Sequence, residues 1–135
     1  VKPAVDLVEC NPFFQREDER AYMESKDIQM QAWSPLSAGQ ANLFRNETLC
    51  AIAASHQKTV AQVALRWLTQ RGIVPIVKSA NPQRMKENLS IFDFTLTEDE
   101  MRQIAALDTG YTCFAPRQTG SAVDDFLKKS LLYQL

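Results

Sequence analysis

The sequence predicts an α/β fold built on a parallel sheet. Three short apolar runs begin near residues 4, 28 and 73, and each is followed by a segment with helical character. Strands that alternate with helices in this way are typical of parallel sheets with helical crossovers. The chain has 135 residues, of which 45% are hydrophobic and 23% charged, which is ordinary for a single soluble domain with a sizeable core.

The three apolar runs have the length and composition of strands. The first extends from Ala4 to Cys10, the second from Ile28 to Trp33, and the third from Ile73 to Val77. Asn11-Pro12 stops the first run, and Ser34-Pro35 stops the second. Ligands bind at the carboxyl ends of the strands in folds of this kind, and this is where the chain has its polar residues. Trp33, at one such end, is on pattern alone best interpreted as a core residue.

Five segments between and after these strands, apart from the tail, have helical patterns. Residues 16–26 have mixed charges and predict a solvent-facing helix, and Asn46 is a plausible N-cap for a short second helix. The clearest helix follows Thr59, which forms a capping-box pattern with Gln62, and Gly72 stands where a helix ends. Its apolar stripe consists of Val60, Val63, Ala64, Trp67 and Leu68.

A second capping-box pattern, Thr97 with Glu100, opens the last helix of the main body. We expect its inward side to consist of Met101, Ile104, Ala105 and Leu107, and residues 108–110 close it. The tail, residues 111–135, has turn residues at Pro116 and Gly120, followed by a weak helical pattern in Phe126, Leu127, Leu131 and Leu132.

The stretch 73–92 predicts an anion-binding site. Its strand ends at Lys78-Ser79, and Asn81-Pro82 then provides an N-cap and a first-turn proline for the next helix. The free N–H groups and the dipole of a helix N-terminus attract an anion, and Lys78 and Arg84 add two cations there. Glu87 and Asn88, one turn further on, offer hydrogen bonds to a base. Solvated surface charge is the alternative interpretation of each of these residues taken singly.

Composition excludes several other classes of function. A net charge of −1 gives no reason to expect nucleic acid or an anionic membrane as partner, and no apolar stretch approaches the ~20 residues of a membrane span. Cys10, Cys50 and Cys113 are widely spaced and form no metal-ligand pattern, so we expect reduced thiols in a cytoplasmic protein and no metal. The single histidine, His56, lies in a polar stretch, and no chemical role is expected for it.

Four segments resemble the C-terminal part of an aldo/keto reductase. They are VECNPFFQ (8–15), AWSPLSAG (32–39), TVAQVALRWLTQRG (59–72) and the run from Val74 to Asp108, in which Lys-Ser, Arg and Glu-Asn precede FDFTLTEDE. The resemblance implies the last three strand–helix units of a (β/α)8 TIM barrel over residues 1–110, with 111–135 as a C-terminal tail. It also implies a protein that reduces aldehydes or ketones with NADPH.

The resemblance assigns ten cofactor-binding positions in this chain. Lys78, Ser79 and Arg84 would bind the 2′-phosphate of the adenosine ribose, and Glu87 and Asn88 would contact the adenine. The remaining positions are Ala80 and Asn81 in the same loop, Trp33 as the ring that stacks on the nicotinamide, and Ser34 and Leu36 along the pyrophosphate.

The chain departs from the family pattern in two respects. Leu7 stands where the family has a glutamine that binds the nicotinamide carboxamide, and a leucine side chain cannot form that hydrogen bond. The catalytic Asp, Tyr, Lys and His of the family lie on earlier strands and have no counterpart in these 135 residues. We therefore assign no catalytic residue and expect the chain alone to be inactive.

Three strands of a barrel would leave apolar edges able to pair with another chain. The expected partners are the missing N-terminal half of the barrel or further copies of this chain, and a small carbonyl compound as substrate. A non-catalytic, regulatory nicotinamide-nucleotide-binding module is the alternative, and a half-barrel without nucleotide binding is a third. The identity of the substrate is open, as is whether Phe114 or Phe126 folds over the pocket.

Overall fold

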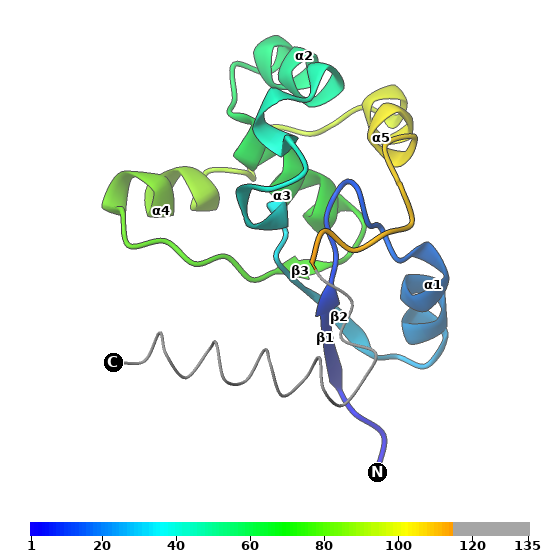
Figure 1. Cartoon of the computed structure of the whole chain (residues 1–135). Coiled ribbons are helices and arrows are strands. Elements are labelled where there is room, and N and C mark those ends of the chain that lie inside the picture. The colour runs from blue at the N-terminus through cyan, green and yellow to red at the C-terminus, as the bar shows by residue number, and fades with distance from the viewer. Residues whose placement is uncertain (115–135) are drawn as a thin grey trace.

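The structure is a computed structural model that describes residues 1–114. Its strands form one parallel sheet in the order β1-β2-β3 (Figure 1). The strands are β1 (Val5–Glu9), β2 (Gln29–Trp33) and β3 (Val74–Pro75). The predicted parallel α/β fold is therefore confirmed. The turns and the helical pattern predicted beyond residue 115 lie outside the described residues.

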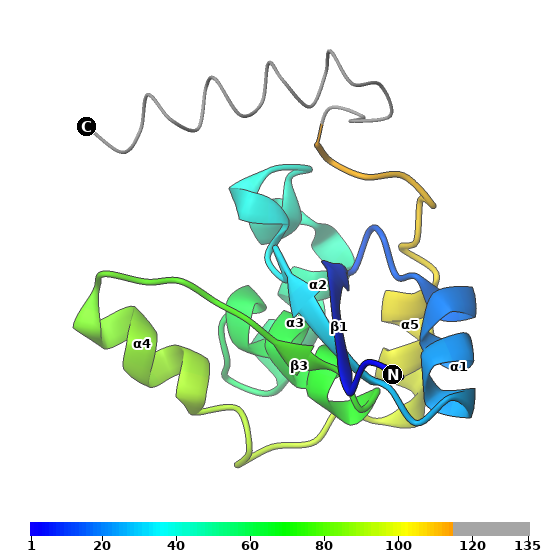
Figure 2. The ribbon, with the colours of Figure 1, turned by 90° about the horizontal axis from the view of Figure 1, so that it is seen from below.

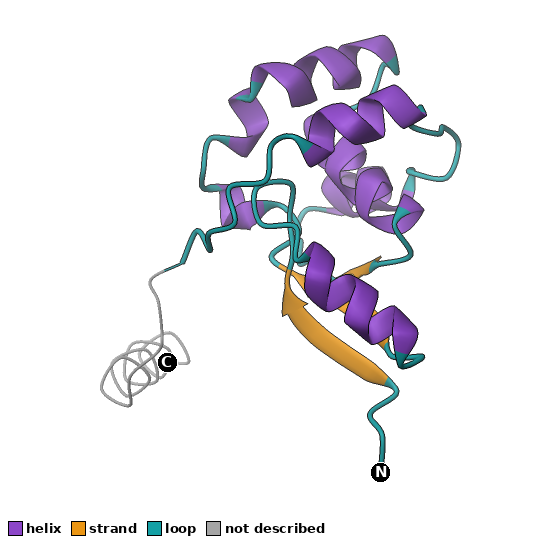
Figure 3. Ribbon diagram, turned by 90° about the vertical axis from the view of Figure 1, so that its right-hand side faces the viewer, coloured by secondary structure: helices purple, strands orange, loops and turns teal. Residues whose placement is uncertain are grey.

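Five α-helices and two short 3-10 turns connect and follow these strands in the described part of the chain. They are α1 (Glu17–Ser25), η1 (Ser37–Gly39), η2 (Leu43–Arg45), α2 (Glu47–Ser55), α3 (Val60–Gln70), α4 (Pro82–Leu89) and α5 (Glu98–Ala105). The helices gather on one side of the strands (Figure 3). Seen from below, α1 lies beside β1, whereas α4 lies beyond β3 (Figure 2). No helix among residues 1–114 is long and apolar enough to cross a bilayer.

The predicted helix caps are present. The side-chain oxygens of Asn46, Thr59, Asn81 and Thr97 each accept a hydrogen bond from the backbone N–H three residues further on. Gly72 follows α3 with a φ of 72°, a left-handed conformation that favours glycine. Ile104 is fully buried in α5 as predicted, but Ala105 is exposed, because it lies at the end of α5 beside the buried face rather than on it.

The third strand is shorter than predicted. We expected Ile73 to Val77, whereas only Val74 and Pro75 pair with β2. Proline has no N–H to donate, and β3 has no second neighbour among the described residues, so the ladder ends early. One further bond, from the Ile76 N–H to the Ala32 carbonyl (2.9 Å), keeps the chain beside β2 as it leaves the sheet.

One face of the sheet is buried and the other is open. Met30 and Ala32 of β2 belong to the same buried core cluster as Trp67 and Leu68 of α3, and none of the four is more than 3% exposed. The alternate residues face the opposite way, and on that side Leu7, Val74 and Ile76 are 50%, 43% and 48% exposed. These three residues define what we call the open face. Uncovered apolar surfaces of this kind are typical of places where a protein or a ligand binds.

Replacing Thr59 by alanine should lower the free energy of unfolding by about 1 kcal/mol, the usual cost of a lost N-cap. The Thr59 Oγ1 accepts from the Gln62 N–H at 3.2 Å, and the Gln62 Oε1 accepts from the Thr59 N–H at 3.0 Å. Urea denaturation would measure the loss. The matched control, Thr59→Ser, keeps the hydroxyl and should lose much less; an equal loss would show that the cap is not responsible.

Candidate functional site

The predicted strand–turn–helix is present at the exit of β3. The Asn81 N–H donates to the Ser79 Oγ at 3.1 Å, and the Ser79 hydroxyl donates to the Asn81 carbonyl at 3.3 Å, which fixes the turn. The Asn81 side chain then accepts from the Arg84 N–H at 3.1 Å, and Pro82 occupies the first position of α4. The turn thereby sets the point at which α4 begins and orients its N-terminus.

A groove of about 970 Å³ lies at this turn. Eight of the ten predicted cofactor-binding residues line it: Leu36, Lys78, Ser79, Ala80, Asn81, Arg84, Glu87 and Asn88. The loop after β2 therefore reaches the same cavity as the turn after β3. A further wall of this groove was not predicted from the sequence and consists of Phe44, Thr59, Val60 and Ala61. The Thr59 capping pattern was a signal for a helix start here, but nothing in the sequence places that start beside α4.

The electrostatics of the groove suit an anion. The first turns of α3 and α4 both line it, and the leading N–H groups of a helix have no partner within the helix. Lys78 and Arg84 form no ion pair within residues 1–114. Glu87, the one carboxylate among the described residues that line the groove, accepts a hydrogen bond from the Gln83 Nε2 at 3.0 Å. Two cations and two helix N-termini thus outweigh this single carboxylate.

Gln62 fixes α4 relative to α3. Its side chain is 6% exposed, and its Nε2 donates to the carbonyls of Glu87 (3.2 Å) and Ser90 (3.0 Å) at the end of α4. Because its Oε1 also caps α3, one buried amide connects the two helices that line the groove. The spacing between these helices is therefore set by a specific polar contact as well as by packing.

The two remaining predicted residues, Trp33 and Ser34, lie at the carboxyl end of β2 and do not line the groove. The Trp33 ring is partly exposed and lies 5.2 Å from the ring of Phe114 at an angle of 48°. Ser34 has a left-handed φ of 52°, and its buried Oγ has no hydrogen-bond partner among the described residues. A buried hydroxyl without a partner is costly and is consistent with a site for a further ligand group.

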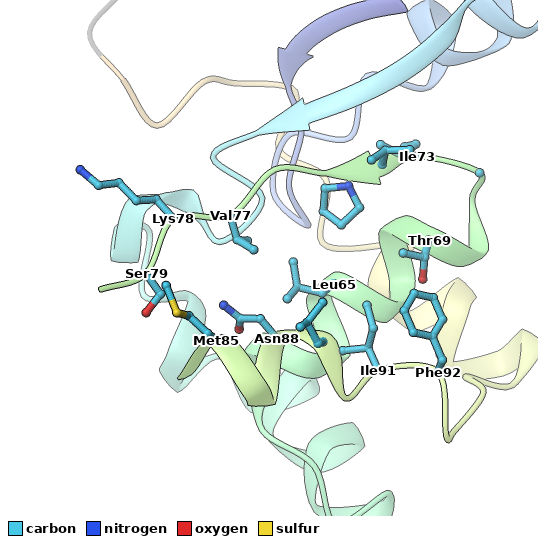
Figure 4. Close-up of a pocket in the computed structure, with 14 residues that line it drawn as sticks. Leu65, Thr69, Ile73, Val77, Lys78, Ser79, Met85, Asn88, Ile91 and Phe92 are labelled. Atoms are coloured by element: carbon cyan, nitrogen blue, oxygen red, sulfur yellow. The ribbon is translucent and has the colours of Figure 1, made fainter. Parts of the chain in front are cut away.

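A second, apolar cavity of about 840 Å³ lies between β3 and α4. Leu65, Val77, Met85 and Ile91 are among the residues around it, and the Lys78 side chain extends away from it (Figure 4). Its lining has almost no polar groups apart from the residues that it shares with the first groove. The cavity is therefore suited to hydrophobic side chains, as a continuation of the open face.

The histidine and the cysteines show no chemical site. The His56 Nε2 lies 2.9 Å from the Glu100 carboxylate and joins α2 to α5, which is a structural contact. Burial raises the pKa of the Cys10 and Cys113 thiols to about 11, so both stay protonated and unreactive. No group of His, Cys, Asp or Glu within residues 1–114 could hold a metal ion.

The groove lies at the carboxyl end of a parallel α/β sheet, which is where folds of this class bind their ligands. The sequence profile of the aldo/keto reductase family matches residues 1–109, and the chain belongs to this family. It is 42% identical over 116 residues to aldose reductase B of Dictyostelium discoideum, of which it covers 37%. That alignment includes 86% of this chain.

Solved structures agree with this assignment. The chain matches MGS-M4, an aldo-keto reductase enzyme from a Medee basin deep-sea metagenome library, with a TM-score of 0.84 and 38% identity over 88% of this chain and 44% of that one. It also matches a Bombyx mori aldo-keto reductase in complex with NADP, with a TM-score of 0.78 and 33% identity over 85% of this chain and 40% of that one. The described part has the fold of part of an aldo-keto reductase barrel, and the chain spans about two fifths of the length of its relatives.

Proposed function

We propose that this chain is the NADPH-binding portion of an aldo/keto reductase that reduces aldehydes or ketones to alcohols. The observation that supports this most directly is the groove at the exit of β3, which combines Lys78 and Arg84 with the first turns of α3 and α4. Its volume of about 970 Å³ lies in the range of small-molecule and cofactor sites. The solved Bombyx mori relative was obtained in complex with NADP.

The donor set fits NADPH better than NADH. Lys78, Ser79 and Arg84 would bind the 2′-phosphate, a group that NADH lacks, while Glu87 and Asn88 would contact the adenine. Ala80 and Asn81 would line the same half of the site. The unpartnered Ser34 hydroxyl and the backbone around Leu36 would follow the pyrophosphate, and the Trp33 ring would provide a face for the nicotinamide.

Bound NADPH would supply a hydride to a small carbonyl substrate. The residues of this chain would bind and orient the cofactor, and the two cations would hold its phosphate end while the aromatic ring positions its reactive end. We assign no proton donor to this chain, so reduction would require groups from a further part of the barrel. A cytoplasmic location is proposed from the three free cysteines.

A non-catalytic nucleotide-binding module is the second candidate. It is favoured by Leu7, which lies on the same face of the sheet as Trp33 and has no hydrogen-bonding group for a nicotinamide carboxamide. Activity of the complete assembly toward aldehydes separates the two candidates: NADPH oxidation that depends on an added carbonyl compound supports the reductase, and NADPH binding without turnover supports the module.

We expect the open face to be covered in solution, by the remaining strands of a barrel or by a second copy of this chain. Native mass spectrometry with added NADPH should therefore show a species heavier than 15.3 kDa. Leu7→Lys should shift the population toward the lone chain, because it places a charge on the open face. Tyr22→Lys is the matched control, since Tyr22 is 63% exposed on α1. If the spectrum shows a lone chain that still binds NADPH, the open face is not covered in solution, and the result supports the non-catalytic binding module.

A further inference from the structure

Glu9 is a buried carboxylate whose hydrogen-bond partners among the described residues are all neutral. It ends β1, it is 5% exposed, and it pairs in register with Trp33. Its two oxygens accept from the Asn11 Nδ2 (3.5 Å), the Thr112 hydroxyl (2.5 Å) and the Cys113 thiol (3.5 Å). Burying a charge away from water is costly, so a carboxylate in this position requires an explanation.

The surroundings of Glu9 are arranged as donors. The Asn11 Oδ1 accepts from the Phe13 N–H at 3.1 Å, which turns its Nδ2 toward Glu9. Burial and the negative charge of Glu9 raise the pKa of the Cys113 thiol to about 11, so the thiol keeps its proton. Three donors therefore face two oxygens. A carboxylate accepts from all three, whereas an amide would turn its own NH2 group toward one of them.

Two of these donors belong to the segment that follows α5. This segment, residues 109–114, is first held at Thr109, whose N–H and hydroxyl donate to the Phe13 carbonyl at 2.9 and 2.7 Å. It then runs to the carboxyl ends of the strands (Figure 1). Glu9 binds it there at Thr112 and Cys113, and the next ring, Phe114, packs on Trp33 at 5.2 Å.

We propose that Glu9 is a positioning residue for the nicotinamide end of the cofactor site. It acts through the segment 109–114: by binding Thr112 and Cys113 it places the Phe114 ring against Trp33 and fixes the orientation of the Trp33 ring. The inference about cofactor binding rests on the proposed function, while the dependence of the Trp33–Phe114 contact on Glu9 does not.

The contact is tested first without cofactor, by NMR on the isotope-labelled protein. In Glu9→Gln we expect the NOE between the Trp33 and Phe114 rings to be lost and the Trp33 indole resonance to shift, while that of the buried Trp67 stays in place. Thr112→Val removes a single donor at nearly constant shape and should have the same effect. Glu98→Gln, an exposed carboxylate on α5, is the matched control. An unchanged NOE in both Glu9→Gln and Thr112→Val would overturn the proposal.

Cofactor binding is tested with two ligands, NADPH and 2′,5′-ADP, which has the 2′-phosphate but no nicotinamide. Glu9→Gln should weaken NADPH by about threefold to tenfold, the range for one aromatic stacking contact, and leave 2′,5′-ADP unchanged. Equal weakening of both ligands would indicate a general structural defect and overturn the positioning role. Failure of the unsubstituted protein to bind either ligand would refute the proposed function, and the NOE would still decide whether Glu9 orders the Trp33–Phe114 pair.

Discussion

Replacing Arg71 by methionine will lower the free energy of unfolding by about 2 kcal/mol, the cost of losing the charge-assisted hydrogen bonds of a guanidinium that is itself largely buried. The Arg71 side chain is 10% exposed, and its Nη2 donates to the Gln15 carbonyl at 3.0 Å and to the Glu17 carboxylate at 2.6 Å. Its guanidinium also lies 4.2 Å from the centre of the Trp67 ring. Methionine retains the apolar stem but removes the charged donor from both acceptors, so Glu17 keeps only Arg20 and the Gln15 carbonyl keeps only the Cys10 thiol.

Urea denaturation of the purified protein measures this loss. Arg102→Met is the matched control, because Arg102 is 70% exposed and pairs with Asp99 within one helix turn. Exposed pairs of that kind contribute about 0.5 kcal/mol or less. Similar losses in the two variants would show that Arg71 is an ordinary surface arginine and that its contacts with α1 and with the loop before it contribute nothing special.

The free energy of unfolding measured as a function of pH on the acid side gives a second test of the role of Arg71. Hydrogen bonds from Arg20 and from Arg71 lower the pKa of Glu17 from its ordinary value of 4.5 to about 2. A carboxyl whose pKa is depressed in the folded state stabilises the fold above about pH 4.5 and loses this contribution as the pH falls toward 2. Arg71→Met removes one of the two donors, so its stability should fall less steeply across that interval than that of the unsubstituted protein.

Contacts that are local in sequence could be predicted, and contacts between distant segments could not. The capping pairs Thr59–Gln62 and Thr97–Glu100 lie within one turn, so the residue types alone predict both helix starts. The residues from Lys78 to Asn88 that line the groove could be grouped for the same reason, because they belong to one continuous run. The predicted length of β3 was wrong, because the point at which this strand ends depends on the position of β2 and on the pairing of Pro75.

The parts of the site that the sequence did not predict come from tertiary packing. Phe44 reaches the groove from η2, and the first turn of α3 lies beside α4, to which Gln62 joins it through carbonyls 25 and 28 residues further along the chain. The contact between Glu9 and Thr112 spans 103 residues, and that between Arg71 and Glu17 spans 54. No residue pattern marks partners at such separations, since each of these side chains taken alone resembles an ordinary polar surface residue.

Arg84→Ala should weaken NADPH binding by ~1.5–3 kcal/mol, which is about tenfold to more than a hundredfold in Kd, and should leave NADH binding nearly unchanged. Arg84 lines the groove together with Lys78 and has no ion pair of its own in the part of the chain that the structure describes. A guanidinium can donate two parallel hydrogen bonds to a phosphate, and the 2′-phosphate is the group that distinguishes the two cofactors.

Calorimetric titration of the same protein with NADPH and with NADH measures both effects. Lys86→Ala is the matched control, because it removes an equal charge from the same helix at a position that does not line the groove. If the phosphate contact is direct, the loss in Arg84→Ala is specific for NADPH and shrinks as salt screens the exposed guanidinium, whereas Lys86→Ala changes little. Equal losses for the two cofactors would mean that Arg84 supports the shape of α4 and does not bind the phosphate, and recognition of the 2′-phosphate would then depend on Lys78 and the two helix N-termini.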